Sequence, residues 1–302
     1  MQAGTSTPSW HLGALWRLPL RELHLSWRFT GRDVRTNIIP PLIFTLAVLR
    51  HAWPITLTEC AWALLRVLVY FWFYSYTFCL PSQIVGVEED RINKPERPLP
   101  AGLVSVRGAY YRYFAALLIY AGLGLCFGVL KWTLLWEAVT VLYVFGGFHR
   151  HWFTKNVVSM TLGTVAQLAA AWELVAPLTA TTFTPVLTVA FMAGVTALVQ
   201  DFRDVAGDRL IGRRTMPIAI GELPARWVVI GIFLLSPLAT YYGLLAGERP
   251  LVRIGCAVVL AAHAYLIAAR VAIFRSAVED HKTYIIYSYW YCAILVARVI
   301  VA

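Results

Sequence analysis

The apolar positions of this 302-residue chain form long, nearly unbroken runs and do not alternate with polar positions. Several runs approach the length of about 20 residues with which an α-helix crosses a hydrocarbon core. We predict nine spans, at residues 37–51, 55–82, 104–129, 132–149, 156–177, 184–202, 225–246, 251–274 and 283–302. The first and fourth runs are short, and we assign them as spans because the topology requires them. Since backbone in lipid must satisfy its own hydrogen bonds, the pattern predicts an all-α fold, a bundle of nine transmembrane helices.

The composition supports a membrane location. Hydrophobic residues make up 59% of the chain and charged residues 14%, whereas soluble domains are about half apolar and about a quarter charged. The formal net charge of +10 would suggest nucleic acid in a soluble protein, but the cytoplasmic loops of membrane proteins also concentrate Lys and Arg. We therefore expect the lipid bilayer, and no nucleic acid, as a partner. The five cysteines are dispersed in apolar stretches, so neither a disulfide framework nor a cysteine metal site is expected.

Residues 1–36 form a basic segment ahead of the first span. The segment lacks an early apolar core followed by a cleavage site, so we expect no signal peptide. It is predicted to lie on the cytoplasmic membrane surface, and residues 37–302 are predicted to form the transmembrane domain. With nine spans, the N-terminus and the loops after spans two, four, six and eight share one face. That face collects most of the Lys and Arg residues, which makes it cytoplasmic.

The first candidate motif is a run of three acids, Glu88, Glu89 and Asp90, at the end of the second span. Basic residues and three prolines follow it at once. Carboxylates near the hydrocarbon boundary are costly and by default mark a functional site. The alternative is a helix that ends in water with solvated charges.

The second motif places Asp201, Asp204 and Asp208 at i, i+3 and i+7, which puts all three on one stripe of a helix. Aligned carboxylates repel one another, and a divalent cation removes that repulsion. Mg²⁺ prefers oxygen ligands shared between carboxylates and substrate phosphates. A solvated helix end with arginine countercharges would explain the charge balance but not the position of the acids at the end of an apolar span.

Together the two motifs indicate a diphosphate site. Carboxylates bind the metal, the metal binds the diphosphate, and guanidinium groups bind the remaining oxygens with bidentate geometry. A diphosphate is a good leaving group when Mg²⁺ and Arg neutralise its developing charge.

The stretch from Glu89 to Gly102, EDRINKPERPLPAG, resembles the first signature of the UbiA superfamily of intramembrane prenyltransferases. The stretch from Asp201 to Pro217, DFRDVAGDRLIGRRTMP, resembles the second, and the region from Tyr143 to Asn156 is more loosely similar to the middle signature. The resemblance covers about residues 35–302. It implies nine helices around a central cavity, capped by the motif loops, with Mg²⁺ and a polyprenyl diphosphate at the rim.

The first motif departs from the family pattern Asn-Asp-x-x-Asp-x-x-x-Asp. Counting back from Arg97, Asp90 falls on the last acid, Gly86 on the middle one and Gln83 on the first. The metal acids of this motif are thus reduced to one, with the two glutamates as neighbouring substitutes. This altered form resembles the fungal UbiA-type membrane terpene cyclases.

The resemblance and the proposed chemistry assign roles to individual residues. The metal ligands are Glu89, Asp90, Asp201, Asp204 and Asp208. The substrate-binding residues are Gln83, Arg97, Lys155, Asn156, Arg213 and Arg214. The catalytic residues are Asp90, Asp204, Asp208, Arg97 and Lys155. Two alternatives stay open, because Lys155 is also explained as a snorkelling lysine and Asn156 as a helix cap. Aromatic residues are dense on the second span, where they serve packing or line a cavity for a carbocation.

Three functions remain possible. In the preferred one, a Mg²⁺-dependent membrane enzyme ionises an allylic diphosphate and cyclises it to a terpene, with farnesyl diphosphate giving a sesquiterpene. In the second, a prenyltransferase moves the prenyl group onto an aromatic or quinone-precursor acceptor. In the third, the chain is a transporter or scaffold without catalysis. The fungal resemblance implies the endoplasmic reticulum membrane, with the motif loops facing the cytoplasm.

Overall fold

The computed structural model describes residues 12–245 and 249–301, and for residues 12–17, 92 and 93 it describes the backbone but not the side chains. Residues 1–11 of the predicted N-terminal segment, and the side chain of Arg17 within it, lie outside the described part. Over the described residues the chain is helical and contains no strand, and a single isolated bridge joins His151 and Arg214. The predicted all-α fold is confirmed.

Every predicted span coincides with a helical segment of the structure. These segments are α3 (Ile39–His51), α4 (Leu57–Val85), α6 (Val106–Cys126), α7 (Leu130–Val144), η2 (Phe153–Met160) continued by α8 (Thr161–Glu173), α9 (Ala180–Thr196), α12 (Glu222–Gly243), α13 (Pro250–Ile273) and α14 (Ala277–Val301). By length and apolar composition, six of the described helical stretches are able to cross a membrane: α4, α6, α9 with its continuation to Leu210, α12, α13 and α14. Helices α3, α7 and α8 have 13, 15 and 13 residues, fewer than the about 20 that span a bilayer alone. Length and composition thus identify six spans rather than nine.

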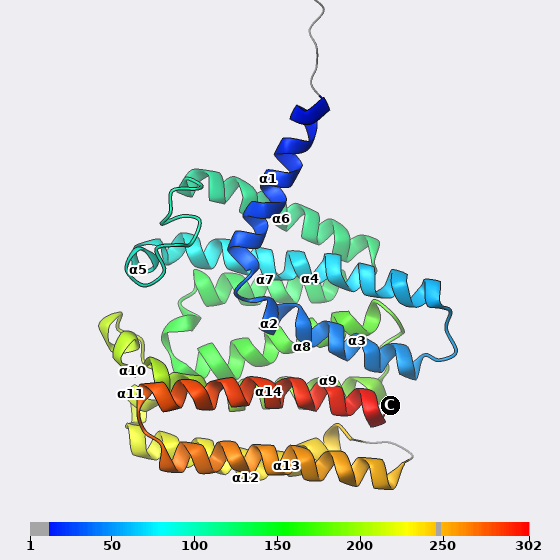
Figure 1. The fold of residues 1–302 in the computed structure, drawn as a ribbon, viewed down its shortest axis with the longest axis vertical. Helices are drawn as coiled ribbons and strands as arrows, with labels where there is room; N and C mark the ends of the chain where they lie inside the picture. The colour runs from blue at the N-terminus through cyan, green and yellow to red at the C-terminus, as the bar shows by residue number, and fades with distance from the viewer. Residues whose placement is uncertain (1–11, 246–248, 302) are drawn as a thin grey trace, which may run out of the picture.

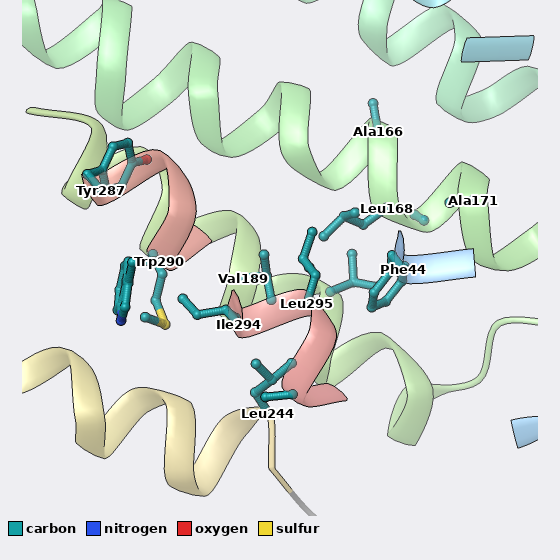
Figure 2. Packing of buried hydrophobic residues seen from close by; sticks show 14 of the residues in the cluster. Phe44, Ala166, Leu168, Ala171, Val189, Leu244, Tyr287, Trp290, Ile294 and Leu295 are labelled. Carbon is teal, nitrogen blue, oxygen red and sulfur yellow. The ribbon is translucent and has the colours of Figure 1, made fainter. Parts of the chain in front are cut away.

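Helix α8 is short because it lies in the middle of the bundle. All its residues from Gly163 to Trp172 are buried, and four of them are alanines. Small residues let membrane helices approach closely, and Gly163 is in direct contact with the ring of Trp136. Figure 2 shows Leu168 packed in the core formed with α3, α9 and α14. A helix surrounded by protein does not need a full lipid-facing length.

Three helices of five to ten residues gather at one end of the bundle. Helix α4 begins with a capping box, in which Thr56 and Glu59 bond each other's backbone amides, and it ends at Gly86. The chain then turns into α5 (Val87–Asn93), which carries the first acidic motif. Helices α10 (Asp201–Leu210) and α11 (Met216–Ile220) lie at the same end (Figure 1). Sequence segments more than 100 residues apart are therefore brought to one face.

Helix α1 (Leu12–Thr30) packs on α4 through the buried side chains of Leu25 and Phe29. Its Glu22 accepts two hydrogen bonds from the Arg112 guanidinium on α6, at 2.6 and 2.8 Å. These bonds lower the pKa of the Glu22 carboxyl. The predicted placement of residues 1–36 on the membrane surface stays a prediction.

A buried ion pair joins the last three helices to the second motif. Arg226 of α12 donates to both oxygens of Asp280 on α14, at 3.1 and 2.8 Å, and to two backbone carbonyls at the end of α13. Its guanidinium also lies 4.5 Å from the ring centre of Phe202, the residue after Asp201. Both charged side chains are 3% exposed, so this pair fixes α10 against α12 and α14.

We predict that Arg226→Gln lowers the free energy of unfolding by about 3–5 kcal/mol, because it leaves the Asp280 carboxylate buried without its partner. Thermal unfolding in detergent measures the loss. The matched control is Glu222→Gln, which removes the exposed partner of Arg226 and should cost less than about 1 kcal/mol. Equal losses in the two variants would contradict the assignment.

Candidate active site

Asp90 is the buried acid of the first motif. Its side chain is 4% exposed, and Arg97 Nη1 donates to Asp90 Oδ2 at 2.6 Å. Lys94 Nζ lies 3.7 Å from the other carboxylate oxygen. The proline-rich turn after α5 places the Arg97 side chain against Asp90. Pro98 and Leu99, which follow Arg97 in this turn, are buried. The structure therefore brings together two of the first-motif residues to which the sequence analysis assigned roles.

Asp201 is the most deeply buried acid of the second motif. It accepts hydrogen bonds from Lys155 Nζ at 2.7 Å and from Asn156 Nδ2 at 3.0 Å. Gln200 Nε2 donates to Asn156 Oδ1 at 2.9 Å, which completes the network. Lys155 and Asn156 lie on η2, whose π-helical winding departs from the α-helix that follows; such irregular turns are frequent at functional sites. Both residues therefore face the second motif, and neither merely snorkels or caps.

Arg213 connects the two motifs. Its Nη1 lies 3.3 Å from Asp208 Oδ1, and its Nη2 lies 3.7 Å from Glu89 Oε2. Gly212, with φ of +68°, allows the tight turn after α10 that returns Arg213 toward Asp208. A single guanidinium thus holds a carboxylate from each motif.

The middle signature is tied to the second motif through backbone. Arg214 N donates to Arg150 O at 2.7 Å, and Trp152 N donates to Arg214 O at 3.0 Å. These bonds bring η1 (Phe148–Arg150) against the turn after α10. The side chain of Arg214 is exposed.

Two predicted site residues lie apart from this network. Asp204 is 45% exposed and pairs with its neighbour Arg203, at 3.2 Å. Gln83 is 2% exposed and donates to Phe29 O of α1 at 2.9 Å, so it helps to dock that helix. Within the described residues, no three His, Cys, Asp or Glu side chains meet as a ready metal site. The aspartates of the predicted stripe are held by separate cations.

The donors nevertheless fit Mg²⁺. In diphosphate sites this ion keeps several waters and takes one or two carboxylates, with the substrate supplying other oxygens. Asp208 Oδ2 is buried and has no hydrogen-bond partner. An unpartnered carboxylate oxygen beside a second acidic motif suits a hard cation that arrives with its substrate.

Aromatic rings lie beneath this polar end. Tyr74 of α4 and Trp136 of α7 stack face to face, with ring centres 3.9 Å apart and planes 9° apart. Phe78 contacts both Trp136 and Tyr143, at 5.5 and 5.6 Å. The sequence identified the aromatic density of the second span but missed Trp136. The spacing of seven between Trp136 and Tyr143, which places both on one side of α7, would have indicated it.

Comparison with known proteins places these features in a family context. The model of the UbiA prenyltransferase family matches residues 38–292. Somaliensene A/B synthase of Streptomyces somaliensis is 40% identical to the chain, over 94% of each protein. Diterpene cyclase eriG of Hericium erinaceus is 38% identical, over 91% of this chain and 87% of the relative. Polyprenyl transferase eriF of the same fungus is 33% identical, over 91% and 93%.

Solved structures support the same fold. A UbiA homolog from Archaeoglobus fulgidus, bound to GPP and Mg²⁺, superimposes with a TM-score of 0.63. The alignment covers 91% of this chain and 99% of the other, at 14% identity. At this identity the likeness concerns the fold.

We predict that Lys155→Met lowers the free energy of unfolding by about 3–5 kcal/mol, because Asp201 would remain buried without its cation. The double variant Lys155→Met/Asp201→Asn should recover most of the loss, since a neutral amide needs no countercharge. Thermal unfolding in detergent measures both.

Lys94→Met serves as the control, because Lys94 lies farther from its acid and is more exposed. It should cost less than about 1 kcal/mol. A double variant as unstable as Lys155→Met alone would show that the pair does not act through charge.

Proposed function

The chain belongs to the UbiA prenyltransferase family of membrane enzymes, and we propose that it ionises an allylic prenyl diphosphate and cyclises the prenyl chain to a terpene. The observation that carries the proposal is the Arg213 bridge between Glu89 and Asp208, which joins two acidic motifs into one polar site at the end of an apolar bundle. The two relatives of highest identity named above, a synthase and a diterpene cyclase, support cyclisation.

The basic residues of the site would bind the diphosphate. Arg97, Lys155 and Arg213 now hold carboxylates at 2.6–3.7 Å. A diphosphate carries more charge than a carboxylate and offers more acceptors, so it can take over part of these bonds. Guanidinium groups bind such oxygens in bidentate fashion. Asn156, Arg214 and Gln83 complete the proposed substrate-binding set.

The proposed metal ligands are Glu89, Asp90, Asp201, Asp204 and Asp208. Mg²⁺ bound there would neutralise the charge that develops on the leaving diphosphate. The pairing of Asp201 with Lys155 indicates that Asp201 also orients the lysine.

Catalysis would begin with cleavage of the bond between the allylic carbon and the diphosphate oxygen, whose electron pair leaves with the diphosphate. The aromatic faces of Tyr74, Phe78, Trp136 and Tyr143 lie next to the polar end and attract cations. An internal double bond of the same chain then attacks the allylic cation and closes a ring. Loss of a proton gives the neutral hydrocarbon.

We also propose nine spans, with α3, α7 and η2–α8 crossing as parts of the bundle, and motif loops on the cytoplasmic side. In a fungal cell the membrane would be the endoplasmic reticulum, and in a bacterium the plasma membrane.

An impermeant thiol reagent should label an introduced Arg209→Cys from the cytoplasmic side. Labelling from the opposite side would contradict this orientation.

A prenyltransferase is the second candidate, because the transferase eriF is 33% identical over nearly the full chain. In that case an aromatic or quinone-precursor acceptor would capture the same allylic cation. The two candidates share the diphosphate site and differ in the acceptor.

The deciding test incubates purified protein in detergent with Mg²⁺ and one prenyl diphosphate at a time: geranyl, farnesyl or geranylgeranyl. We expect a cyclic hydrocarbon without any acceptor, detected by gas chromatography with mass detection, and farnesyl diphosphate is our first substrate. Turnover of geranylgeranyl diphosphate alone would keep cyclisation and change the chain length. Product formed only after addition of an aromatic acceptor would overturn the cyclase proposal. Omission of Mg²⁺ should abolish product.

We further predict that Asp208→Asn and Asp204→Ala each reduce turnover by at least about 10²–10³-fold, the scale seen when one transition-state stabiliser is lost. Both variants should stay folded, because Asp204 is 45% exposed and Arg213 keeps Glu89 as a partner in Asp208→Asn. Glu59→Gln is the control, because Glu59 caps α4 far from the motif and glutamine keeps the cap. Full activity of both aspartate variants would refute the metal assignment.

A further inference from the structure

Helices α4, α6 and α7 share a row of polar side chains in the interior of the bundle. Each helix contributes two residues seven positions apart, so that both lie on one face. These are Tyr70 and Thr77 on α4, Tyr113 and Tyr120 on α6, and Thr133 and Thr140 on α7, with Glu137 between the last two. We refer to these seven residues as the polar seam.

Contacts join several members of the seam across the three helices. The hydroxyls of Tyr70 and Thr133 lie 2.9 Å apart, and the rings of Tyr70 and Tyr120 are 4.9 Å apart. The Thr77 hydroxyl approaches the Glu137 carboxylate. Tyr70, Tyr113 and Tyr120 all lie close enough to interact with that carboxylate electrostatically.

Glu137 is half-buried as a whole residue, and it differs from the buried acids at the polar end because no Lys, Arg or His among the described residues pairs with it. Both of its carboxylate oxygens are shut off from solvent and lack a partner in hydrogen-bonding geometry. Asp90, Asp201 and Asp280, in contrast, each hold a Lys or Arg within 4 Å. A bare carboxylate in such surroundings costs several kcal/mol or more, so it normally pairs or becomes neutral.

The charged residues on the three helices are engaged elsewhere. Arg112 on α6 binds Glu22, Arg107 stacks on Tyr111, and Lys131 on α7 binds Glu173. Arg66 on α4 lies about three turns from Thr77. The titratable groups that face Glu137 are the hydroxyls of Tyr70, Tyr74, Tyr113 and Tyr120. These groups are neutral at physiological pH.

We infer that Glu137 is a proton-binding site within the membrane and that its side chain is a neutral carboxylic acid in the folded protein. A solvated metal ion cannot reach oxygens that have no accessible surface, whereas a proton can. Two other seam oxygens, Tyr120 Oη and Thr140 Oγ1, are also buried without a partner in hydrogen-bonding geometry. This site is independent of the diphosphate chemistry.

Infrared spectroscopy of the full-length protein in detergent at neutral pH tests the inference. Wild type should show the carbonyl stretch of a protonated carboxylic acid, a band separate from the amide and carboxylate bands, and Glu137→Gln should lack it. Glu173→Gln is the matched control: Glu173 accepts hydrogen bonds from Lys131 and Trp132, so that variant should keep the band. Identical spectra of wild type and Glu137→Gln in this region would overturn the inference.

Stability gives a second readout. Because glutamine is neutral and nearly isosteric, Glu137→Gln should unfold within a few degrees of wild type. If Glu137 were instead ionised and paired with a buried cation, this substitution would leave that cation without a countercharge. The unfolding temperature would then fall markedly. A marked decrease would therefore also refute the neutral acid.

Discussion

The arrangement of this protein depends on neutralising carboxylates where an apolar bundle meets water. At that end of the described structure, each of the deeply buried acids is held by a basic side chain, which lies either on the turn after its helix or on a distant segment. The pairs are Asp90 with Arg97, Asp201 with Lys155, Asp208 with Arg213, and Asp280 with Arg226. Since a buried charge without a partner is strongly destabilising, these pairs hold α5, η2, α10 and α14 in their places. The helices supply the apolar frame, and the pairs determine how their ends meet.

The same pairs prepare the proposed chemistry. In the pairs formed by Asp90, Asp201 and Asp208, the cations that stabilise the acids are the ones that would bind a diphosphate, and the acids are the ones that would bind its metal. Arg213 shows this most directly, because it contacts a carboxylate of each motif. Substrate binding would exchange partners within a set of charges already positioned, so little reorganisation is needed during the reaction.

The sequence predicted the helices and the location of both motifs, because long apolar runs and clustered acids are local properties. It did not predict that Asp201 and Asp204 would differ in burial, since that difference arises from contact with η2, a segment 45 residues away. Gln83 was predicted to bind substrate but lies against α1, a contact that depends on how that helix folds back. The sequence alone does not distinguish Glu137, because the surroundings of a single acid in an apolar run depend on residues of other helices.

The contact between Gly163 and Trp136 has a consequence for how such proteins diversify. A methyl group at position 163 would come within 2.8 Å of the indole ring, so the aromatic stack with Tyr74 would have to shift. The ion pairs at the end of the bundle would keep their positions, because none of them involves α8. A single change at this small residue would therefore reshape the apolar interior while leaving the charged residues at the end of the bundle in place.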